Sequence, residues 1–169
     1  SLEALLEAET MDRTSVCILV DKEEIGSVGA TGMDSLFFEN ATAEVLAKMG
    51  LTSSLSLRRT LKNTMMLSSD VNSAYDPLNA SLYDKKNSSF LGGGVVFNIY
   101  TGSRGKSGAS DANPEFIGKI RGVLEKNGVK YQMAEMAKVD VGGGGTIAKF
   151  SAYYGMQVID CGVAILSMH

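Results

Sequence analysis

Residues 15–27 read SVCILVDKEEIGS, and this stretch does most to define the fold. Its apolar first half, residues 15–20, predicts a buried strand, and the glycine-rich sequence that follows predicts a loop. Two adjacent carboxylates, Glu23 and Glu24, fall where the strand meets the loop. Burying two carboxylates is costly without a partner, and a metal ion is one partner that offsets the cost. The stretch therefore predicts a metal site at the end of a strand.

The composition is typical of a soluble globular protein and argues against several other classes. The 169 residues suit one domain with a sizeable core, and the net charge of −3 gives no reason to expect nucleic acid as a partner. No apolar run reaches the roughly 18 residues of a membrane span, and no signal peptide is visible. Cys17 and Cys161 lie in apolar runs, which predicts two buried, reduced thiols in a cytoplasmic protein and leaves a disulfide open.

Strands are expected to alternate with helices along the chain. The expected helices cover residues 2–8, 35–48, 54–62, 114–126 and 146–154. The expected strands cover 15–20, 64–67, 95–100, 130–134, 157–160 and 163–167, with polar loops over 71–90 and 101–110. Ser110 or Asp111 is the expected N-cap of the helix at 114–126. This alternation predicts α/β layers around a largely parallel sheet, in which ligands gather beyond the carboxyl ends of the strands.

A shared position links four side chains. At or just after the carboxyl end of an apolar run lie Glu23, Glu24, Asp70 and His169. Each alone has an ordinary structural explanation, but the shared position favours a site. Carboxylates and one imidazole suit zinc, cobalt or manganese, and one of two adjacent glutamates can ligate a metal while the other takes a proton from the attacking water. One histidine and three carboxylates are too few for a closed two-metal site, so either the site is mononuclear or other ligands lie outside residues 1–169.

Two glycine-containing stretches need separate interpretation. The cluster at 142–145 precedes an expected helix, so its N–H groups would approach a peptide substrate or a tetrahedral oxyanion, or its glycines would allow close backbone packing. The stretch at 102–107 lacks the glycine that a phosphate-binding loop needs at position 100, which is Tyr100. It predicts a solvated basic loop.

Four motifs occur together: DKEEIGS at 21–27, SSD at 68–70, GGGGTIA at 142–148 and LSMH at 166–169. In this order and spacing, nearly the whole chain resembles the aspartyl aminopeptidase and vacuolar aminopeptidase I family of di-metal metallopeptidases. The resemblance implies a zinc-peptidase-like three-layer α/β/α sandwich with a mixed, largely parallel sheet, incomplete in this piece. It implies that residues 1–169 form the C-terminal part of the catalytic domain, without the upstream catalytic strands and the dimerisation domain. It also implies peptide substrates and self-assembly into a tetrahedral dodecamer.

The resemblance also implies roles for single residues. Glu23 matches the general base, Glu24 and His169 match ligands of one metal ion, and Asp70 matches a ligand of a second. The two divalent ions are expected to be zinc, with cobalt or manganese as alternatives. The family's other ligands are expected upstream of Ser1. The residues expected to contact the substrate are Phe97, Gly144, Gly145 and Met168.

The expected substrate preference follows from departures from the acidic-specific branch of the family. That branch has a lysine that pairs with an acidic side chain, and the matching residue here is Phe97; Ser73 and Asp76 stand where the branch has two histidines. A buried carboxylate without a partner costs on the order of several kcal/mol, so a neutral or apolar N-terminal residue is expected. An acidic-specific enzyme stays an alternative, because Arg104 or Lys106 in the neighbouring loop would supply the positive charge that pairs with an acidic side chain. A deblocking aminopeptidase, a deacylase and a catalytically silent assembly subunit are further alternatives.

Overall fold

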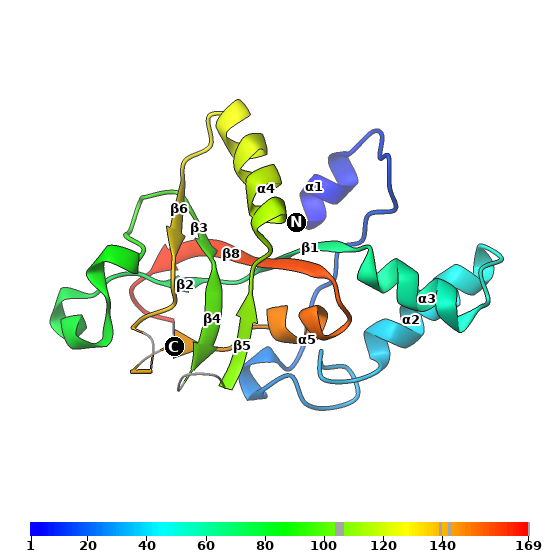
Figure 1. Cartoon of the computed structure of the whole chain (residues 1–169), viewed down its shortest axis with the longest axis horizontal. Helices are drawn as coiled ribbons and strands as arrows, with labels where there is room; N and C mark the ends of the chain where they lie inside the picture. Colours follow the sequence, from blue (N-terminus) through cyan, green and yellow to red (C-terminus); the bar gives the residue numbers. More distant parts are fainter. Residues whose placement is uncertain (104–106, 139, 142, 169) are drawn as a thin grey trace. The chain divides into compact units, whose positions relative to one another are not determined.

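The computed structural model describes residues 1–103, 107–138, 140–141 and 143–168 (Figure 1). The chain forms two compact units, Ser1–Phe38 and Glu39–His169. Among the described residues, no helix combines the length and the apolar character that crossing a membrane would take.

The first unit begins with α1, Leu2–Glu7, as expected. The prediction of a buried strand over residues 15–20 is wrong. This segment forms no strand among the described residues, and its side chains Val16 and Leu19 are 70% and 77% exposed. The N–H and C=O groups of a strand need a neighbouring strand to take their hydrogen bonds, and an apolar run does not by itself provide one. The 3₁₀-helix η1, Glu23–Ile25, follows this segment.

Two expected helices form close to their predicted bounds: α2, Phe37–Lys48, and α3, Ser54–Lys62. α3 begins where a serine caps it, because Ser53 Oγ accepts a 3.1 Å hydrogen bond from the Leu55 N–H. After α2 the chain turns at Gly50, whose φ of 82° is a left-handed conformation that favours glycine. Local capping signals therefore set the start of α3 and the end of α2.

The main sheet contains five strands. They are β1 (Met65–Ser69), β2 (Asn72–Ser73), β3 (Val95–Asn98), β6 (Tyr131–Ala134) and β8 (Gln157–Ile165). The order is β1-β8-β3-β6, and β2 also pairs with β8. β1 and β2 run parallel to β8, β3 runs antiparallel to β8, and β6 runs parallel to β3. The expected α/β class with a mixed, largely parallel sheet and flanking helices is confirmed.

β8 is one strand of nine residues, where two shorter strands were expected. The expected break falls around Gly162, which stays inside the strand. A Cβ on Gly162 would lie 1.4 Å from the carbonyl oxygen of Asp70, so the backbone that follows β1 passes directly beside this glycine. Glycine at this position therefore marks a close backbone approach and not the end of a strand.

A second, antiparallel sheet has the order β5-β4-β7. Its strands are β4 (Tyr100–Ser103), β5 (Ser107–Asp111) and β7 (Gly143–Gly144). The prediction of a loop is therefore wrong for residues 101–103 and 107–110, while residues 104–106, with Arg104 and Lys106, lie outside the described part of the chain. The Gly- and Ser-rich sequence lacks the apolar alternation by which strands are recognised, so it gave no signal of this pairing. The short helix α5, Ala148–Tyr153, follows β7.

The polar segment 71–90 contains β2 and two 3₁₀-helices, η2 (Pro77–Leu82) and η3 (Lys85–Asn87). Each 3₁₀-helix begins at an aspartate. The carboxylates of Asp76 and Asp84 accept hydrogen bonds of 2.9 and 3.1 Å from backbone N–H groups two residues ahead. The expected long loop is therefore structured by its own capping side chains.

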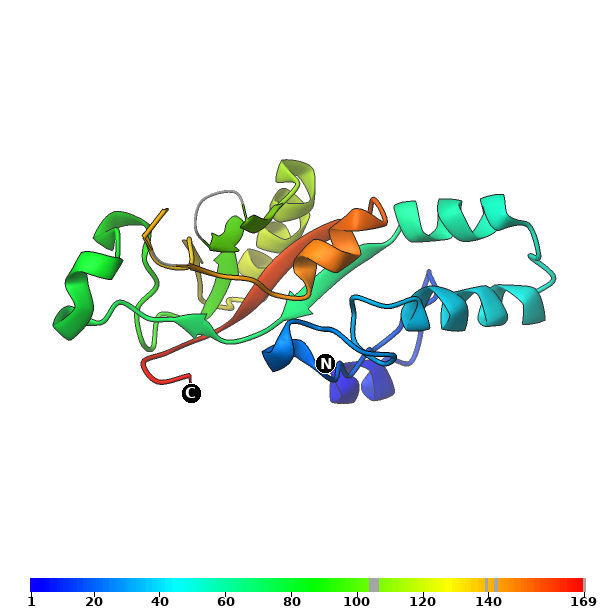
Figure 2. The same ribbon diagram turned by 90° about the horizontal axis from the view of Figure 1, so that it is seen from below.

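The core of the second unit lies between the main sheet and α4, Pro114–Lys126 (Figures 1 and 2). Its buried cluster consists of Phe97, Ala112, Phe116 and Ile159. α4 begins at Asn113, whose Oδ1 accepts a 3.0 Å hydrogen bond from the Phe116 N–H. The expected caps, Ser110 and Asp111, are wrong, because the proline at the first helical position places the cap directly before it.

Candidate active site

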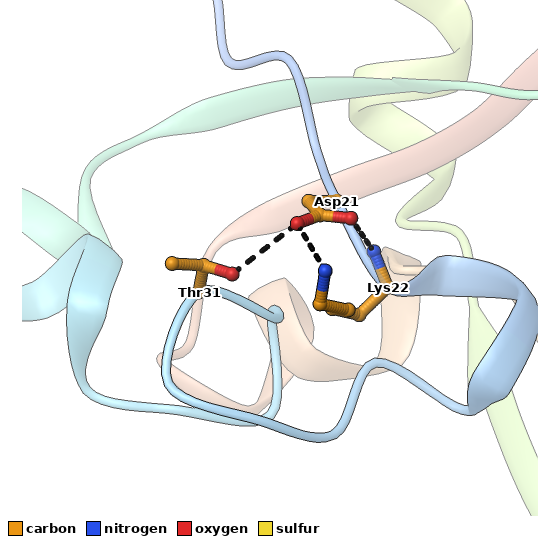
Figure 3. A network of polar contacts seen from close by, with 3 residues as sticks. All are labelled: Asp21, Lys22 and Thr31. Carbon is orange, nitrogen blue, oxygen red and sulfur yellow. Dashed lines mark hydrogen bonds and ion pairs between the residues drawn. The ribbon is translucent and has the colours of Figure 1, made fainter.

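A strained turn precedes the two glutamates of the first unit, and Figure 3 shows its residues Asp21 and Lys22 with Thr31. Lys22, just before them, has φ 68°, a left-handed conformation that costs a non-glycine residue roughly 1–2 kcal/mol. Asp21 holds this turn: its Oδ1 accepts a 2.7 Å hydrogen bond from the Lys22 N–H, and its Oδ2 accepts bonds of 2.6 Å from Lys22 Nζ and 3.4 Å from Thr31 Oγ1. The bonds from Lys22 lower the pKa of Asp21. Glu23 and Glu24 therefore follow a turn that their neighbours fix in direction.

The glutamates are less buried than the sequence suggests. Within their unit Glu23 is half-buried and Glu24 is exposed. After the two glutamates, the turn ends at Ser27. This residue is buried, and its N–H donates a 2.7 Å hydrogen bond to the Lys22 carbonyl. The two carboxylates are therefore not both buried in this unit, so the burial argument that first suggested a metal ion does not apply here. The pair remains a candidate because of its position on the held turn.

Asp70 follows β1 and is anchored through its backbone. Its N–H donates a 2.9 Å hydrogen bond to the Cys161 carbonyl of β8. Its half-buried carboxylate accepts a 2.7 Å bond from the Val71 N–H through Oδ1, and no donor among the described residues bonds Oδ2. Asp70 therefore offers one carboxylate oxygen to an external ligand at the carboxyl end of β1.

A buried polar network surrounds the segment that carries Asp70. Its centre is Asp160 of β8, which is 3% exposed. Asp160 Oδ1 accepts a 2.7 Å hydrogen bond from Ser68 Oγ, and Oδ2 accepts a 3.1 Å bond from Asn98 Nδ2. Burial raises the pKa of Asp160, and the bonds from Ser68 and Asn98 oppose that rise. The carboxyl group is thus removed from water but supplied with donors.

The network extends from Asn98 into the polar segment after β1. Asn72 Nδ2 donates a 2.6 Å hydrogen bond to Asn98 Oδ1, and Ser89 Oγ donates a 2.6 Å bond to Asn72 Oδ1. Asn72 and Ser89 are fully buried. Asp160 was not among the predicted site residues, although one carboxylate inside the apolar run 157–166 is a signal of a buried polar site.

Phe97 lies in the core, which gives no support to the predicted contact with a substrate. Its side chain is 3% exposed and belongs to the cluster that packs under α4. Its ring meets the ring of Tyr131 edge-on, with 6.2 Å between centroids. Because side chains alternate along a strand, Phe97 lies on the face of β3 opposite to Asn98 and the polar network. Matching Phe97 to the family's lysine position did not show which face of β3 its side chain occupies.

Gly143 and Gly144 of the glycine cluster form β7, and the helix that follows the cluster, α5, starts two residues beyond Thr146, where the expected helix began. A Cβ on Gly144 would lie 2.9 Å from Met136 Sδ, which favours close packing as the role of this glycine. Gly145 has open space where a Cβ would stand. A contact of either glycine with a substrate stays a prediction.

The predicted metal ligands do not form a cluster in the part of the chain that the structure describes. No three His, Cys, Asp or Glu side chains gather there in a way that would hold a metal ion. Glu24 belongs to the first unit and Asp70 to the second, and His169 lies outside the described residues. Met168, before it, is 38% exposed. The donor chemistry of Glu24 and of Asp70 fits zinc, because each side chain supplies carboxylate oxygens.

Comparison with known proteins identifies one family. The family model for the aminopeptidase I zinc metalloproteases (M18) matches residues 1–169. The probable M18 family aminopeptidase 1 of Clostridium acetobutylicum is 57% identical to this chain over 169 residues. The match covers 100% of this chain and 36% of that relative, so the chain spans little more than a third of its length.

Solved structures show the same fold. The crystal structure of aminopeptidase I from Clostridium acetobutylicum matches with a TM-score of 0.81 at 57% identity, covering 96% of this chain and 34% of that one. The mApe1 dodecamer of S. cerevisiae matches with a TM-score of 0.61 at 25% identity, covering 89% of this chain and 31% of that one. The resemblance stated from the motifs is thereby confirmed. The chain belongs to the M18 family of aminopeptidase I zinc metalloproteases.

Proposed function

We propose that the protein is a metal-dependent aminopeptidase that removes the N-terminal residue of peptides. The match of residues 1–169 to a zinc aminopeptidase family carries this proposal. When bound, divalent ions, proposed to be two zinc ions, supply Lewis-acid chemistry. Glu24 and His169 would hold one ion and Asp70 the other, while Glu23 would take a proton from the attacking water.

The held turn before Glu23 supports its role as the base. A general base must keep a fixed direction toward the proton that it removes. The Asp21 carboxylate supplies such a restraint, since it bonds both the backbone N–H and the Nζ of Lys22. Asp70 is a proposed metal ligand, and its carboxylate oxygen that has no donor among the described residues is suited to a cation.

A neutral or apolar N-terminal residue is the proposed substrate preference. Ser73 and Asp76, which stand where acidic-specific relatives are expected to have histidines, are engaged inside the segment 71–90. Ser73 Oγ lies 2.6 Å from Tyr83 Oη, and Asp76 caps η2. Neither side chain supplies positive charge to an acidic substrate. Gly144, Gly145 and Met168 stay as proposed substrate contacts in the second unit.

The proposal extends to assembly and setting. A homo-oligomer, with the dodecamer as its expected form, is supported by the similarity to the mApe1 dodecamer. Residues 1–169 are proposed to be the C-terminal part of a catalytic domain. A cytoplasmic location is expected from reduced thiols, and both Cys17 and Cys161 are free.

The test is hydrolysis of leucyl-anilide and aspartyl-anilide by the full-length protein, with and without a chelator. Cleavage of the leucyl substrate that the chelator abolishes and zinc restores is the expected result. Preference for the aspartyl substrate would keep the enzyme class and overturn the neutral preference. A protein that binds metal and cleaves neither anilide would favour a deblocking aminopeptidase or a deacylase. A protein without metal or cleavage would be a silent assembly subunit.

A further inference from the structure

We propose that Asp160 is a positioning residue that fixes the direction of Asp70 at the end of β1. The inference rests on the proposed function, in which Asp70 is a metal ligand. It is drawn from the hydrogen bonds on either side of Asp70, from the close approach of β8, and from the burial of the side chains involved.

Asp160 anchors the chain on both sides of Asp70. Two residues before Asp70, the hydroxyl of Ser68 donates directly to Asp160 Oδ1 at 2.7 Å. Two residues after Asp70, Asn72 reaches Asp160 through the amide of Asn98 by bonds of 2.6 and 3.1 Å. Ser68 and Asn72 are each 0% exposed, so water does not compete for these bonds. The segment 68–72 is therefore fastened at both ends to one carboxyl group.

The direction of the hydrogen bonds explains why this group is a carboxylate. Ser89 donates to Asn72, Asn72 donates to Asn98, and both Asn98 and Ser68 donate to Asp160. Every donor in this series of hydrogen bonds therefore points toward Asp160, whose two carboxylate oxygens accept. An asparagine at position 160 would place its N–H₂ group either against Asn98 Nδ2, which cannot accept, or against Ser68 Oγ, which would have to accept instead of donate.

β8 holds the segment by its backbone as well. Ser68 pairs with Asp160 and Ser69 with Cys161 in the parallel register, and the Asp70 N–H donates to the Cys161 carbonyl at 2.9 Å. The next residue, Gly162, lets the Asp70 carbonyl approach to a place that a Cβ would occupy. Three consecutive residues of β8 thus set the position of the backbone from which the Asp70 carboxylate projects.

A role in stability alone makes a different prediction from a positioning role. Residues that orient metal ligands typically change metal affinity by roughly 10- to 100-fold when they are substituted. A network that only stabilises the fold would lower the melting temperature and leave metal affinity unchanged. Metal affinity, measured separately from activity, therefore distinguishes the two roles.

The experiment uses metal-free full-length protein titrated with cobalt(II) in competition with a chelator. The variants are Asp160→Asn and Ser68→Ala, and the matched control is Ser151→Ala. Ser151 is also 0% exposed, but its hydroxyl has no hydrogen-bond partner among the described residues. Circular dichroism and the melting temperature report folding for each variant, and the visible cobalt spectrum reports ligand geometry.

The expected result is selective weakening of one metal ion. Asp160→Asn should raise the Kd of one of two cobalt ions by roughly 10- to 100-fold and alter its visible spectrum. Ser68→Ala should act in the same direction with a smaller change, and Ser151→Ala should bind both ions as the wild type does. If Asp160→Asn fails to fold, Ser68→Ala decides the question alone.

Two results would overturn the inference, and they differ in what else they reject. A folded Ser68→Ala or Asp160→Asn variant with wild-type affinity for both ions would reject the positioning role and leave the proposed function intact. A folded wild-type protein that binds no cobalt would reject the proposed function, and the positioning role with it.

Discussion

Ser68 and Asp160 face each other across the parallel pairing of β1 and β8, and the Ser68 hydroxyl donates a 2.7 Å hydrogen bond to Asp160 Oδ1. Both side chains are almost completely removed from water, at 0% and 3% exposure. The register of the two strands is therefore marked by a polar contact, which belongs to the buried network that also contains Asn98 and Asn72. Leaving one of these two buried polar groups without its hydrogen-bond partner is costly, so the pair is expected to contribute to the stability of the fold.

Ser68→Ala should lower the free energy of unfolding by roughly 1.5–3 kcal/mol, the range for a hydrogen bond to a charged group. Urea denaturation of the full-length protein, followed by circular dichroism, measures the change. Ser151→Ala removes an equally buried hydroxyl that has no partner among the described residues, so it should cost less or even stabilise. Equal losses in the two variants would contradict the importance of the Ser68–Asp160 bond.

Gly162→Ala should destabilise the protein, because its Cβ would lie 1.4 Å from the Asp70 carbonyl oxygen and force the two backbones apart. Overpacking of this kind costs about 1–3 kcal/mol and sometimes more. The melting temperature measures the effect, with Gly122→Ala in α4 as the control. Among the described residues, nothing outside the helix backbone and the neighbouring residues lies within 4 Å of a Cβ on Gly122, and alanine has a higher helix propensity than glycine. The prediction fails if the two variants melt at the same temperature.

Cys161 should be alkylated slowly at neutral pH, since burial, assisted by the nearby charge of Asp160, raises the pKa of its thiol to about 11. The rate of reaction with iodoacetamide in a Cys17→Ser background should rise until about pH 11. The folded protein holds this proton more tightly than the unfolded chain. The thiol's contribution to stability is therefore present below pH 9.0 and is lost as the pH rises toward about 11. A rate that levels off near pH 9 would show an unperturbed thiol.

Phe97→Ala should destabilise the protein by about 3–5 kcal/mol, as expected for the loss of a buried aromatic ring from a core. The reason is its place in the cluster with Ala112, Phe116 and Ile159. Denaturant unfolding measures the loss, and Phe97→Leu, which keeps more of the volume, should lose less. A Phe97→Ala variant that keeps its stability and changes its kcat/KM for leucyl-anilide would instead show a direct contact with the substrate.

The sequence predicted the α-helices and the strands β1, β3, β6 and β8 because their signals are local. The apolar periodicity of residues 54–62 and 114–126 is enough to locate α3 and α4, although the expected cap of α4 was wrong. The run at 15–20 misled because a strand depends on a neighbour, and no residue in the run shows whether one is there. Gly162 misled for the opposite reason, since its purpose lies in the backbone of Asp70, far away in the sequence.

The candidate site was predictable in its parts and not in its arrangement. Motifs named Glu23, Glu24 and Asp70, and the structure places the first two on a held turn and the third at the end of β1. The role of Asp160 depends on hydrogen bonds between residues that are 92 and 62 positions apart, which no local pattern reveals. Phe97 shows the same limit, because which face of β3 meets the core is set by tertiary packing.

The most direct test of the central claim is to measure metal content and leucyl-anilide hydrolysis together in the wild type and in Glu23→Gln. Glutamine keeps the shape of the side chain but cannot take a proton, and removing a general base slows catalysis by roughly 10²- to 10⁴-fold. We expect that Glu23→Gln folds and binds the same number of zinc ions as the wild type, and that its turnover is lower by roughly 10²- to 10⁴-fold. A folded, metal-loaded Glu23→Gln protein with near wild-type turnover would contradict the assignment of Glu23 as the base of a metal-dependent aminopeptidase.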